Sequence, residues 1–292
     1  MKEFKGKVAV VTGAGNGIGA ALAHKCADEG MKVVLAGINL DNLKRVENEL
    51  KAKNATVISV KTDVSKADEV ENLAKESYAA FGAVDLLINN AGVYASIGVD
   101  AWDATLQDWQ WVLGVNLYGV INGIKSFVPK MLGQDTEGHI VNVASIAGLI
   151  SSPGGSVYRA SKHAAVSLSE SLFLDLIQAK SKIGVSVICP SFVKTKLVDS
   201  ERSRPAELQN DPSSFKRNEA KEQKTRQNVE EGISAEELAE TTFKAIIDEQ
   251  FYVLSKESDL PVIRVRTDNI ANLRNPYDSH VAALQGSSVE SK

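Results

Sequence analysis

Short, continuously apolar runs alternate with helix-like stretches along most of this chain of 292 residues, and this alternation restricts the fold more than any other feature. The first run, KVAVVT at residues 7–12, is rich in β-branched residues and ends at a glycine. A run that is apolar throughout predicts a strand buried on both faces. Such strands, separated by helices, predict an α/β fold with a doubly wound parallel sheet of about seven strands and helices on both faces.

The boundaries of the expected elements follow from apolar spacing and from glycine and proline signals. Strands are expected at residues 7–12, 32–36, 56–60, 84–88, 139–143, 185–189 and 251–254. Helices are expected at residues 20–29, 40–53, 66–81 and 157–180, with two more across 105–132. A chain of this length can form one such unit, so we expect a single domain over residues 1–255 and a C-terminal extension over 256–292.

A glycine-rich turn, GAGNGIG at residues 13–19, directly follows the first expected strand and opens a helix. Glycines here let the backbone approach a pyrophosphate, and the helix amino terminus offers free N–H groups. The spacing differs from the common G-x-G-x-x-G fingerprint, because Ile18 stands where the third glycine would be. The turn therefore indicates a Rossmann-type dinucleotide site, with a purely structural turn as the alternative.

A tyrosine and a lysine, Tyr158 and Lys162, stand four residues apart in an expected helix, thirteen residues after Ser145. Four residues are about one helical turn, so the two side chains share a face. A free tyrosine with a pKa of ~10 is a poor base near neutrality, and a nearby ammonium lowers that value. An isolated pair of this kind is usually ordinary helix surface, so its meaning depends on the other motifs.

Those motifs occur in a fixed order: the TG-xxx-GIG turn from Thr12, the NNAG segment at residues 89–92, Asn116, Ser145, and the Tyr158–Lys162 pair. In this order and spacing the chain resembles the compact, single-domain branch of the short-chain dehydrogenase/reductase family over about residues 5–255. The resemblance implies an NAD(P)-dependent oxidoreductase that interconverts a secondary alcohol and a ketone.

The resemblance also implies roles for four catalytic residues. Tyr158 would protonate the alkoxide or deprotonate the alcohol, and Lys162 would lower the pKa of Tyr158 and bind the nicotinamide ribose. Ser145 would hydrogen-bond the reacting oxygen, and Asn116 would hold a water that links Lys162 to solvent. Taken alone, Ser145 is equally a turn residue, and Asn116 is equally a polar residue inside a helix.

The cofactor residues implied by the resemblance follow the ends of the strands, with Asp63 accepting from the adenine amino group and Val64 beside the ring. The full set is Gly13, Asn16, Gly17, Ile18, Gly19, Gly37, Ile38, Asp63, Val64, Asn89, Asn90, Ala91, Gly92, Tyr158, Lys162, Pro190, Val193 and Thr195. One departure from the family pattern is Ser191, which stands where a glycine usually follows the proline.

A second departure concerns the choice between NAD and NADP. An NAD-preferring member carries Asp or Glu just after the second strand, to bind the ribose 2′-hydroxyl, and this chain has Gly37 there. The cation that favours a 2′-phosphate is also absent, because Ile38 and Asn16 occupy the usual positions. We therefore predict relaxed cofactor choice, with NADP tolerated or favoured.

The substrate pocket is expected to involve residues 94–102, residues 147–153 and the segment after Thr195. Apolar side chains there, Leu149, Ile150, Phe192 and Leu197, indicate an uncharged, partly hydrophobic small-molecule substrate, unless they only pack the core. Residues 194–232 are long and highly charged, which predicts a substrate lid. The alternative is a solvated helical pair. The basic residues of the segment 194–232 suggest an anionic substrate only if the interleaved acids do not offset them.

Composition restricts partners and location. The net charge of −4 gives no basic field for nucleic acid or an acidic membrane surface. The first residues are too polar for a secretory signal, and no apolar run approaches the ~20 residues of a membrane span. Cys26 and Cys189 are expected to be buried thiols, neither a disulfide nor a metal pair, so we expect a cytoplasmic protein without a metal site.

The C-terminal extension contains enough apolar and aromatic residues to pack on another surface. Family members commonly form tetramers, so we expect a homo-oligomer, a tetramer or a dimer, with this extension at a subunit boundary. Residues 285–292 are small and polar and are expected to be disordered. Two other functions remain open: a non-catalytic nucleotide-binding regulatory protein, and a lyase or epimerase with tightly bound NAD.

Overall fold

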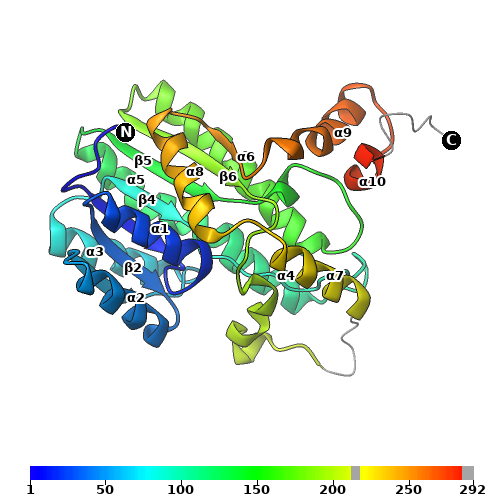
Figure 1. Ribbon diagram of the computed structural model, residues 1–292, viewed down its shortest axis with the longest axis horizontal. Coiled ribbons are helices and arrows are strands. Elements are labelled where there is room, and N and C mark those ends of the chain that lie inside the picture. Colours follow the sequence, from blue (N-terminus) through cyan, green and yellow to red (C-terminus); the bar gives the residue numbers. More distant parts are fainter. Residues whose placement is uncertain (212–217, 285–292) are drawn as a thin grey trace.

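The structure is a computed structural model, and it describes residues 1–211 and 218–284. Its described part contains a seven-stranded parallel sheet in the order β3-β2-β1-β4-β5-β6-β7 (Figure 1). The strands are β1 (Val8–Thr12), β2 (Lys32–Gly37), β3 (Val57–Lys61), β4 (Leu86–Asn89), β5 (Gly138–Val143), β6 (Ile183–Cys189) and β7 (Tyr252–Leu254). The predicted doubly wound α/β fold is confirmed, and each expected strand is present within two residues of its predicted ends.

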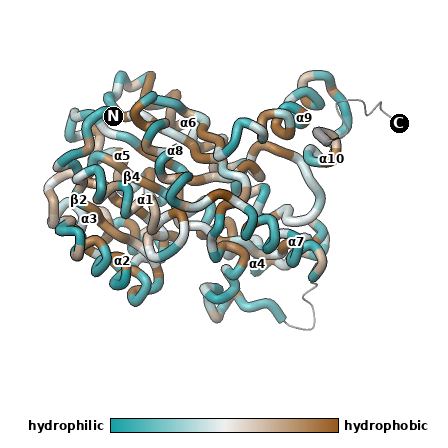
Figure 2. The backbone as a smooth tube through the Cα atoms, viewed as in Figure 1, coloured by the Kyte–Doolittle hydropathy of each residue, from teal (hydrophilic) through white to brown (hydrophobic). Residues whose placement is uncertain are grey.

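Helices cover both faces of the sheet. One face carries α1 (Gly17–Asp28), α2 (Leu40–Ala52) and α8 (Ala235–Ile247), and the other carries α3 (Ala67–Phe81), α5 (Gly119–Gly133) and α6 (Ser156–Gln178). Successive strand residues point to opposite faces, so Val10 and Val11 of β1 belong to different core clusters. Figure 2 shows this apolar interior between hydrophilic outer helix surfaces.

Helix α8 was not predicted from the sequence. It begins after Ser234, whose side chain accepts a hydrogen bond from the Glu237 N–H, and it packs against α1. The signal that could have found it is this serine cap with acidic residues in the first turn.

The two helices expected across 105–132 form one continuous rod. Helix α4 (Leu106–Leu113) passes into a π-helical turn, η1 (Gly114–Tyr118), and then into α5. Single π-turns inside α-helices are frequent at functional sites. Asn116 lies in this turn.

The order of the strands reverses between β1 and β4. The chain runs outward from β1 through β2 to β3 and then returns to place β4 on the other side of β1. In sheets of this kind ligands bind at such a switch point, beyond the carboxyl ends of the strands. The glycine turn follows β1 there, and Asn90 follows β4.

Late segments of the chain lie to one side of the sheet (Figure 1). They are η3 (Leu197–Ser203), η4 (Ala206–Leu208), α7 (Glu219–Glu230), η5 (Glu257–Asp259), α9 (Leu260–Ala271) and α10 (Ser279–Leu284). The disorder predicted for residues 285–292 falls outside the described residues. No helix within the described ranges is long and apolar enough to cross a membrane. Both cysteines are buried and unpaired, as predicted.

Candidate active site

A cavity of about 1300 Å³ runs along the carboxyl ends of the strands. Its cofactor end is lined by residues from the segments 13–18, 37–38, 63–64 and 90–92. Its substrate end is lined by residues from the segments 94–98, 150–159, 192–208, 220–229 and 278–280. Most predicted site residues border it: Gly13, Asn16, Gly17, Ile18, Gly37, Ile38, Asp63, Val64, Asn90, Ala91, Gly92, Ser145, Tyr158, Lys162, Pro190, Val193 and Thr195. Gly19, Asn89 and Asn116 do not border the cavity and lie behind the residues that do.

The glycine turn has the close backbone packing that a pyrophosphate site requires. Gly13 has a φ of +65°, and a Cβ atom there would lie 2.9 Å from the Cα atom of Ala91. At Gly19 a Cβ atom would lie 2.3 Å from the Gly13 carbonyl oxygen. The turn therefore packs directly on β4's following segment, with the amino terminus of α1 open to the cavity, and this arrangement fits a dinucleotide.

Hydrogen bonds join the ends of β1, β4 and β5 beneath this turn. The Thr12 Oγ1 atom accepts from the Asn90 N–H at 2.9 Å, and the Asn90 side-chain amide donates to the Thr12 carbonyl at 2.8 Å. One strand further, the Asn89 amide donates to Asn142 Oδ1 at 2.9 Å. Asn89 and Asn90 thus fix the strand ends beneath the turn.

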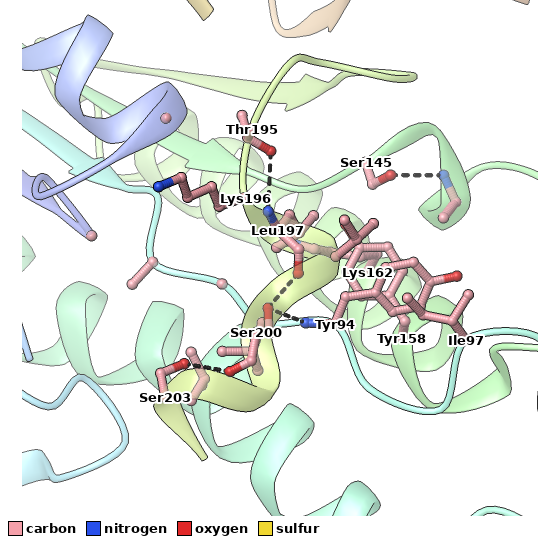
Figure 3. Close-up of a pocket in the computed structure, with 18 of the residues that line it drawn as sticks. Tyr94, Ile97, Ser145, Tyr158, Lys162, Thr195, Lys196, Leu197, Ser200 and Ser203 are labelled. Atoms are coloured by element: carbon pink, nitrogen blue, oxygen red, sulfur yellow. Dashed lines mark hydrogen bonds between the residues drawn. The ribbon is translucent and has the colours of Figure 1, made fainter. Parts of the chain in front are cut away.

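Three of the four predicted catalytic side chains, Ser145, Tyr158 and Lys162, lie at one wall of the cavity (Figure 3). Tyr158 and Lys162 lie one turn apart on α6, both nearly fully buried, with the Lys162 Nζ atom 5.6 Å from the centre of the Tyr158 ring. Ser145 follows β5, and its Oγ atom accepts from the Ala147 N–H at 3.1 Å. The Tyr94 ring stacks on Tyr158 at 4.3 Å between centroids.

Burial dominates the electrostatics of this wall. Burial raises the pKa of the Tyr158 hydroxyl, and the hydrogen bond with Ser145 opposes that shift. Burial lowers the pKa of Lys162 to about 8. The Lys162 Nζ atom donates to the Val143 carbonyl at 2.9 Å, and its expected effect on the pKa of Tyr158 stays a prediction. Ser145 is the polar neighbour that favours the phenolate.

Asn116 sits behind this wall and is fully engaged with the chain. Its Oδ1 atom accepts from the Val93 N–H at 2.8 Å, and its amide donates to the Val93 carbonyl and to Ser161 Oγ, both at 3.0 Å. These bonds tie the π-turn to α6 and to the irregular segment that follows NNAG. Its expected role in holding a water beside Lys162 stays a prediction.

Two departures from the family pattern have clear structural settings. Gly37 ends β2 at the cavity, and a Cβ atom there would meet nothing closer than 3.5 Å, so a side chain fits. Ser191, in the place of a glycine, is fixed by Ser255: its N–H donates to Ser255 Oγ at 3.0 Å and the two hydroxyls lie 2.9 Å apart. This link to the end of β7 places Pro190, Val193 and Thr195 at the cavity.

The apolar residues expected at the substrate end divide into two groups. Ile150, Phe192 and Leu197 border the cavity, whereas Leu149 packs against a core cluster beneath it. Trp102 is 82% exposed and lies outside the cavity, so the pocket draws only on the first part of the segment 94–102.

Several residues of this cavity lie outside the segments that the sequence predicted for it, among them Asp278 and His280. Between them, the Ser279 N–H donates to the Ser151 carbonyl at 2.8 Å and its hydroxyl accepts from the Ser151 N–H at 3.0 Å. The C-terminal extension therefore packs on the loop after Ser145 in its own chain. Nothing in the local sequence pairs two serines this far apart, so only the fold reveals the contact.

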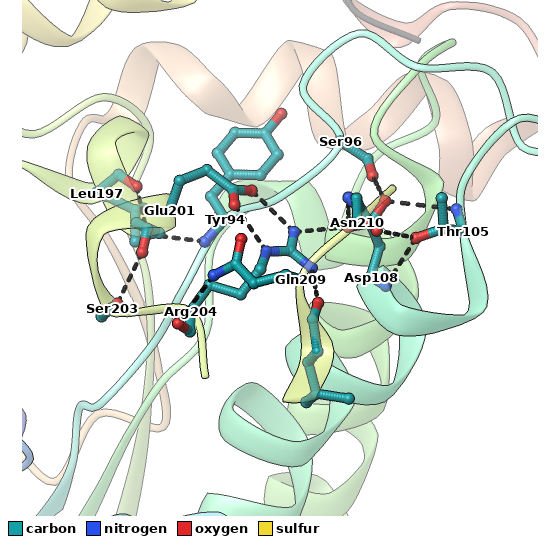
Figure 4. Close-up of polar contacts among 12 residues, drawn as sticks. Tyr94, Ser96, Thr105, Asp108, Leu197, Glu201, Ser203, Arg204, Gln209 and Asn210 are labelled. Carbon is teal, nitrogen blue, oxygen red and sulfur yellow. Dashed lines mark hydrogen bonds and ion pairs between the residues drawn. The ribbon is translucent and has the colours of Figure 1, made fainter. Parts of the chain in front are cut away.

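A buried ion pair fixes part of the segment predicted as a lid (Figure 4). Arg204 donates from Nη2 to Asp108 Oδ1 at 2.6 Å, and both side chains are fully buried. Its guanidinium also bonds Glu201 and lies 4.3 Å above the Trp111 ring. Residues 197–208 are thereby anchored to α4.

Comparisons with known proteins agree with this site. Residues 7–206 match the family model described as short chain dehydrogenase. A short chain dehydrogenase/reductase from Burkholderia phymatum, solved in complex with NAD, is 46% identical with a TM-score of 0.92, over 95% of this chain and 99% of that one. A CLA biosynthesis dehydrogenase/reductase from Lactiplantibacillus plantarum is 36% identical over 96% of this chain and 98% of its own.

A further relative, the 1-deoxy-11-beta-hydroxypentalenate dehydrogenase of Streptomyces exfoliatus, is 31% identical over 90% of this chain and 88% of its own. The chain therefore belongs to the short-chain dehydrogenase/reductase family. It is an oxidoreductase of that family, and the family and the NAD-bound relative support a nicotinamide cofactor.

Proposed function

We propose that this protein is an NAD(P)-dependent dehydrogenase or reductase that interconverts a secondary alcohol and a ketone. The observation that carries the proposal is the convergence of Ser145, Tyr158 and Lys162 on one wall of a cavity that also holds the glycine turn. A regulatory protein that only binds a nucleotide has no need for this buried tyrosine–lysine pair.

In the proposed mechanism the bound nicotinamide supplies or accepts the hydride. The Tyr158 hydroxyl donates a proton to the substrate oxygen during reduction and accepts it during oxidation. The Ser145 hydroxyl holds the same oxygen and stabilises the charge that develops on it. Lys162, whose pKa is lowered to about 8, would bind the ribose of the cofactor. It would also exchange protons with the part of the site that holds Tyr158.

The domain proposal follows from the same cavity. Residues 1–255 would form the cofactor and catalytic domain, with residues 194–232 covering the substrate. Because the Arg204–Asp108 pair anchors the first half of that cover, we infer that α7 is the part that moves.

Cofactor choice would be relaxed, because the wall at Gly37 and Ile38 carries neither an acid nor a base. The NAD complex of the Burkholderia relative supports NAD as one accepted cofactor. Introducing an acid by Gly37→Asp should shift the ratio of NADH to NADPH activity toward NADH by about tenfold or more, since the carboxylate repels a 2′-phosphate. An unchanged ratio in side-by-side kinetics would overturn this explanation.

A homo-oligomer in the cytoplasm is the remaining part of the proposal. Large apolar side chains are exposed on the helical rod and on α6, namely Tyr118, Leu132, Leu174 and Ile177. Such side chains suit a subunit interface. The two buried free thiols agree with a reducing compartment.

The test is oxidation of NADH and NADPH, side by side, with a panel of ketones and aldehydes. We expect turnover by the native protein and a loss of about 10²–10⁴-fold in kcat for Tyr158→Phe, with cofactor binding retained. Cofactor binding without turnover by the native protein would favour the regulatory alternative. A nicotinamide cofactor that copurifies and is never released would favour a lyase or epimerase.

A further inference from the structure

Helix α7 separates its charges between two sides. The residues that border the main cavity are Ala220, Lys221, Lys224, Thr225, Asn228 and Val229, a stripe at helical spacing. The acids of the helix lie elsewhere: Glu222 bonds Arg226 on the opposite side, and Glu219 and Glu230 do not border the cavity. Acids and bases are interleaved in the sequence of α7, but the side of the helix that faces the cavity is cationic.

The two lysines are available for a ligand. Lys221 and Lys224 have no ion-pair partner among the described residues, unlike Arg226, which pairs with Asp199 and Glu222. The Lys221 stem packs beside Gly98, where a Cβ atom would lie 2.6 Å from it. Through this contact α7 packs against the loop that also carries Tyr94 and Ile97.

The other charged groups at the substrate end are also more often basic than acidic. Lys196, Arg202 and Arg159 also border it, against two acids, Glu207 and Asp278. The Asp278 carboxylate is already engaged with the Ser152 hydroxyl and the His280 N–H. A cationic mouth on a chain with a net charge of −4 is a local feature that concentrates anions.

The wall around Tyr158 is apolar by contrast. Tyr94, Ile97, Ile150, Phe192 and Leu197 border the cavity between the catalytic tyrosine and the late segments. A substrate that fills both regions has an apolar body near its reacting carbon and a negative charge at its far end.

We propose that Lys221 and Lys224 form an anion-binding end of the substrate site, which takes a carboxylate carried on an apolar alcohol or ketone. This inference rests on the proposed function. The ammonium groups would bind the carboxylate at the cavity mouth, where water and salt still have access.

The test compares an apolar keto acid, whose ketone is remote from the carboxylate, with its methyl ester. For the native protein we expect kcat/KM to favour the acid by about tenfold or more at low salt, and the preference to shrink as salt is added. The double variant Lys221→Gln/Lys224→Gln should bring the ratio of acid to ester close to one. The matched control Lys53→Gln/Lys75→Gln removes two exposed lysines that lie away from the cavity and should keep the native ratio.

The outcomes separate the inference from the proposed function. Turnover of both compounds with the same ratio in the native protein and the double variant would overturn the inference and leave the reaction intact. An alkyl phosphate ketone preferred over the keto acid would overturn the carboxylate assignment. If neither compound turns over, calorimetry with the keto acid and the NADH-loaded protein still decides: binding that is equal in the native protein and the double variant rejects the anion site.

Discussion

The two ends of the cavity are built in different ways. The cofactor end uses backbone and small residues at the ends of adjacent strands, locked by the Thr12–Asn90 and Asn89–Asn142 hydrogen bonds. The substrate end uses long side chains from segments that are far apart in the chain, and it depends on the buried Arg204–Asp108 pair and on the Ser151–Ser279 contact.

This difference separates what the molecule holds fixed from what it can vary. A backbone cradle tolerates almost no added atom, because the surrounding strands cannot move apart without loss of sheet hydrogen bonds. Side chains on a covering segment can change without disturbing the sheet. The same scaffold can therefore keep one cofactor and accept different substrates.

The largest effect should come from adding one carbon to the cofactor end. In Gly19→Ala the new Cβ atom would lie 2.3 Å from the Gly13 carbonyl oxygen, so the turn must move. We expect cofactor affinity to fall about 100-fold or more, with a lower free energy of unfolding, even though alanine ordinarily favours a helix. Fluorescence titration with NADH and thermal unfolding measure both.

Gly37→Ala is the matched control, since its Cβ atom meets nothing closer than 3.5 Å. It should retain NADH affinity within about twofold, because ordinary van der Waals contact costs little. Equal losses in the two variants would show that the cradle is not limited by this close approach.

The next largest effect should come from the anchor of the substrate end. Arg204→Met leaves the Asp108 carboxylate buried and unpaired, which typically costs about 3–5 kcal/mol. We expect faster proteolysis and hydrogen exchange across residues 197–208 and a higher KM for substrate, while the Kd for NADH stays unchanged. A change in NADH affinity as large as the change in KM would contradict the independence of the two ends.

Arg226→Met provides the comparison for that variant. Arg226 also pairs with an aspartate, Asp199, but its side chain is 39% exposed. Exposed pairs contribute about 0–1 kcal/mol, so proteolysis should change little.

Sequence reasoning reached the cofactor end far more completely than the substrate end, and the reason is physical. The turn, the NNAG segment and the tyrosine–lysine pair are each local, and each follows a strand whose apolar run is visible in the sequence. Asp278 and His280 reach the cavity only through a contact with Ser151, which no local periodicity encodes.

The direction in which charged side chains point was the second feature that the sequence did not predict. In the sequence the lysines and glutamates of residues 219–230 alternate, and only the orientation of α7 determines that Lys221 and Lys224 face inward. Likewise the tyrosine–lysine spacing indicates proximity but not direction, and only the structure shows that the Lys162 Nζ atom donates to the Val143 carbonyl.

The last predicted effect concerns the sheet that supports both ends, and it appears on acidification. Burial lowers the pKa of His139, in β5, to about 3, and the amino-terminal ammonium adds to the shift. In the unfolded chain this pKa returns to ~6.5, so between these values the unfolded state binds more protons and stability falls as the pH falls. The contribution should reach about 2 kcal/mol at pH 5.

Denaturant unfolding at pH 7 and pH 5 checks this, with the pH-dependent difference as the readout. His139→Gln should reduce that difference by most of the 2 kcal/mol, about the effect of one neutral buried histidine, whatever the variant does to stability at pH 7. If acid instead loosens residues 197–208 before the sheet unfolds, as seen by proteolysis at pH 5, the substrate end and not His139 sets the acid limit of the protein.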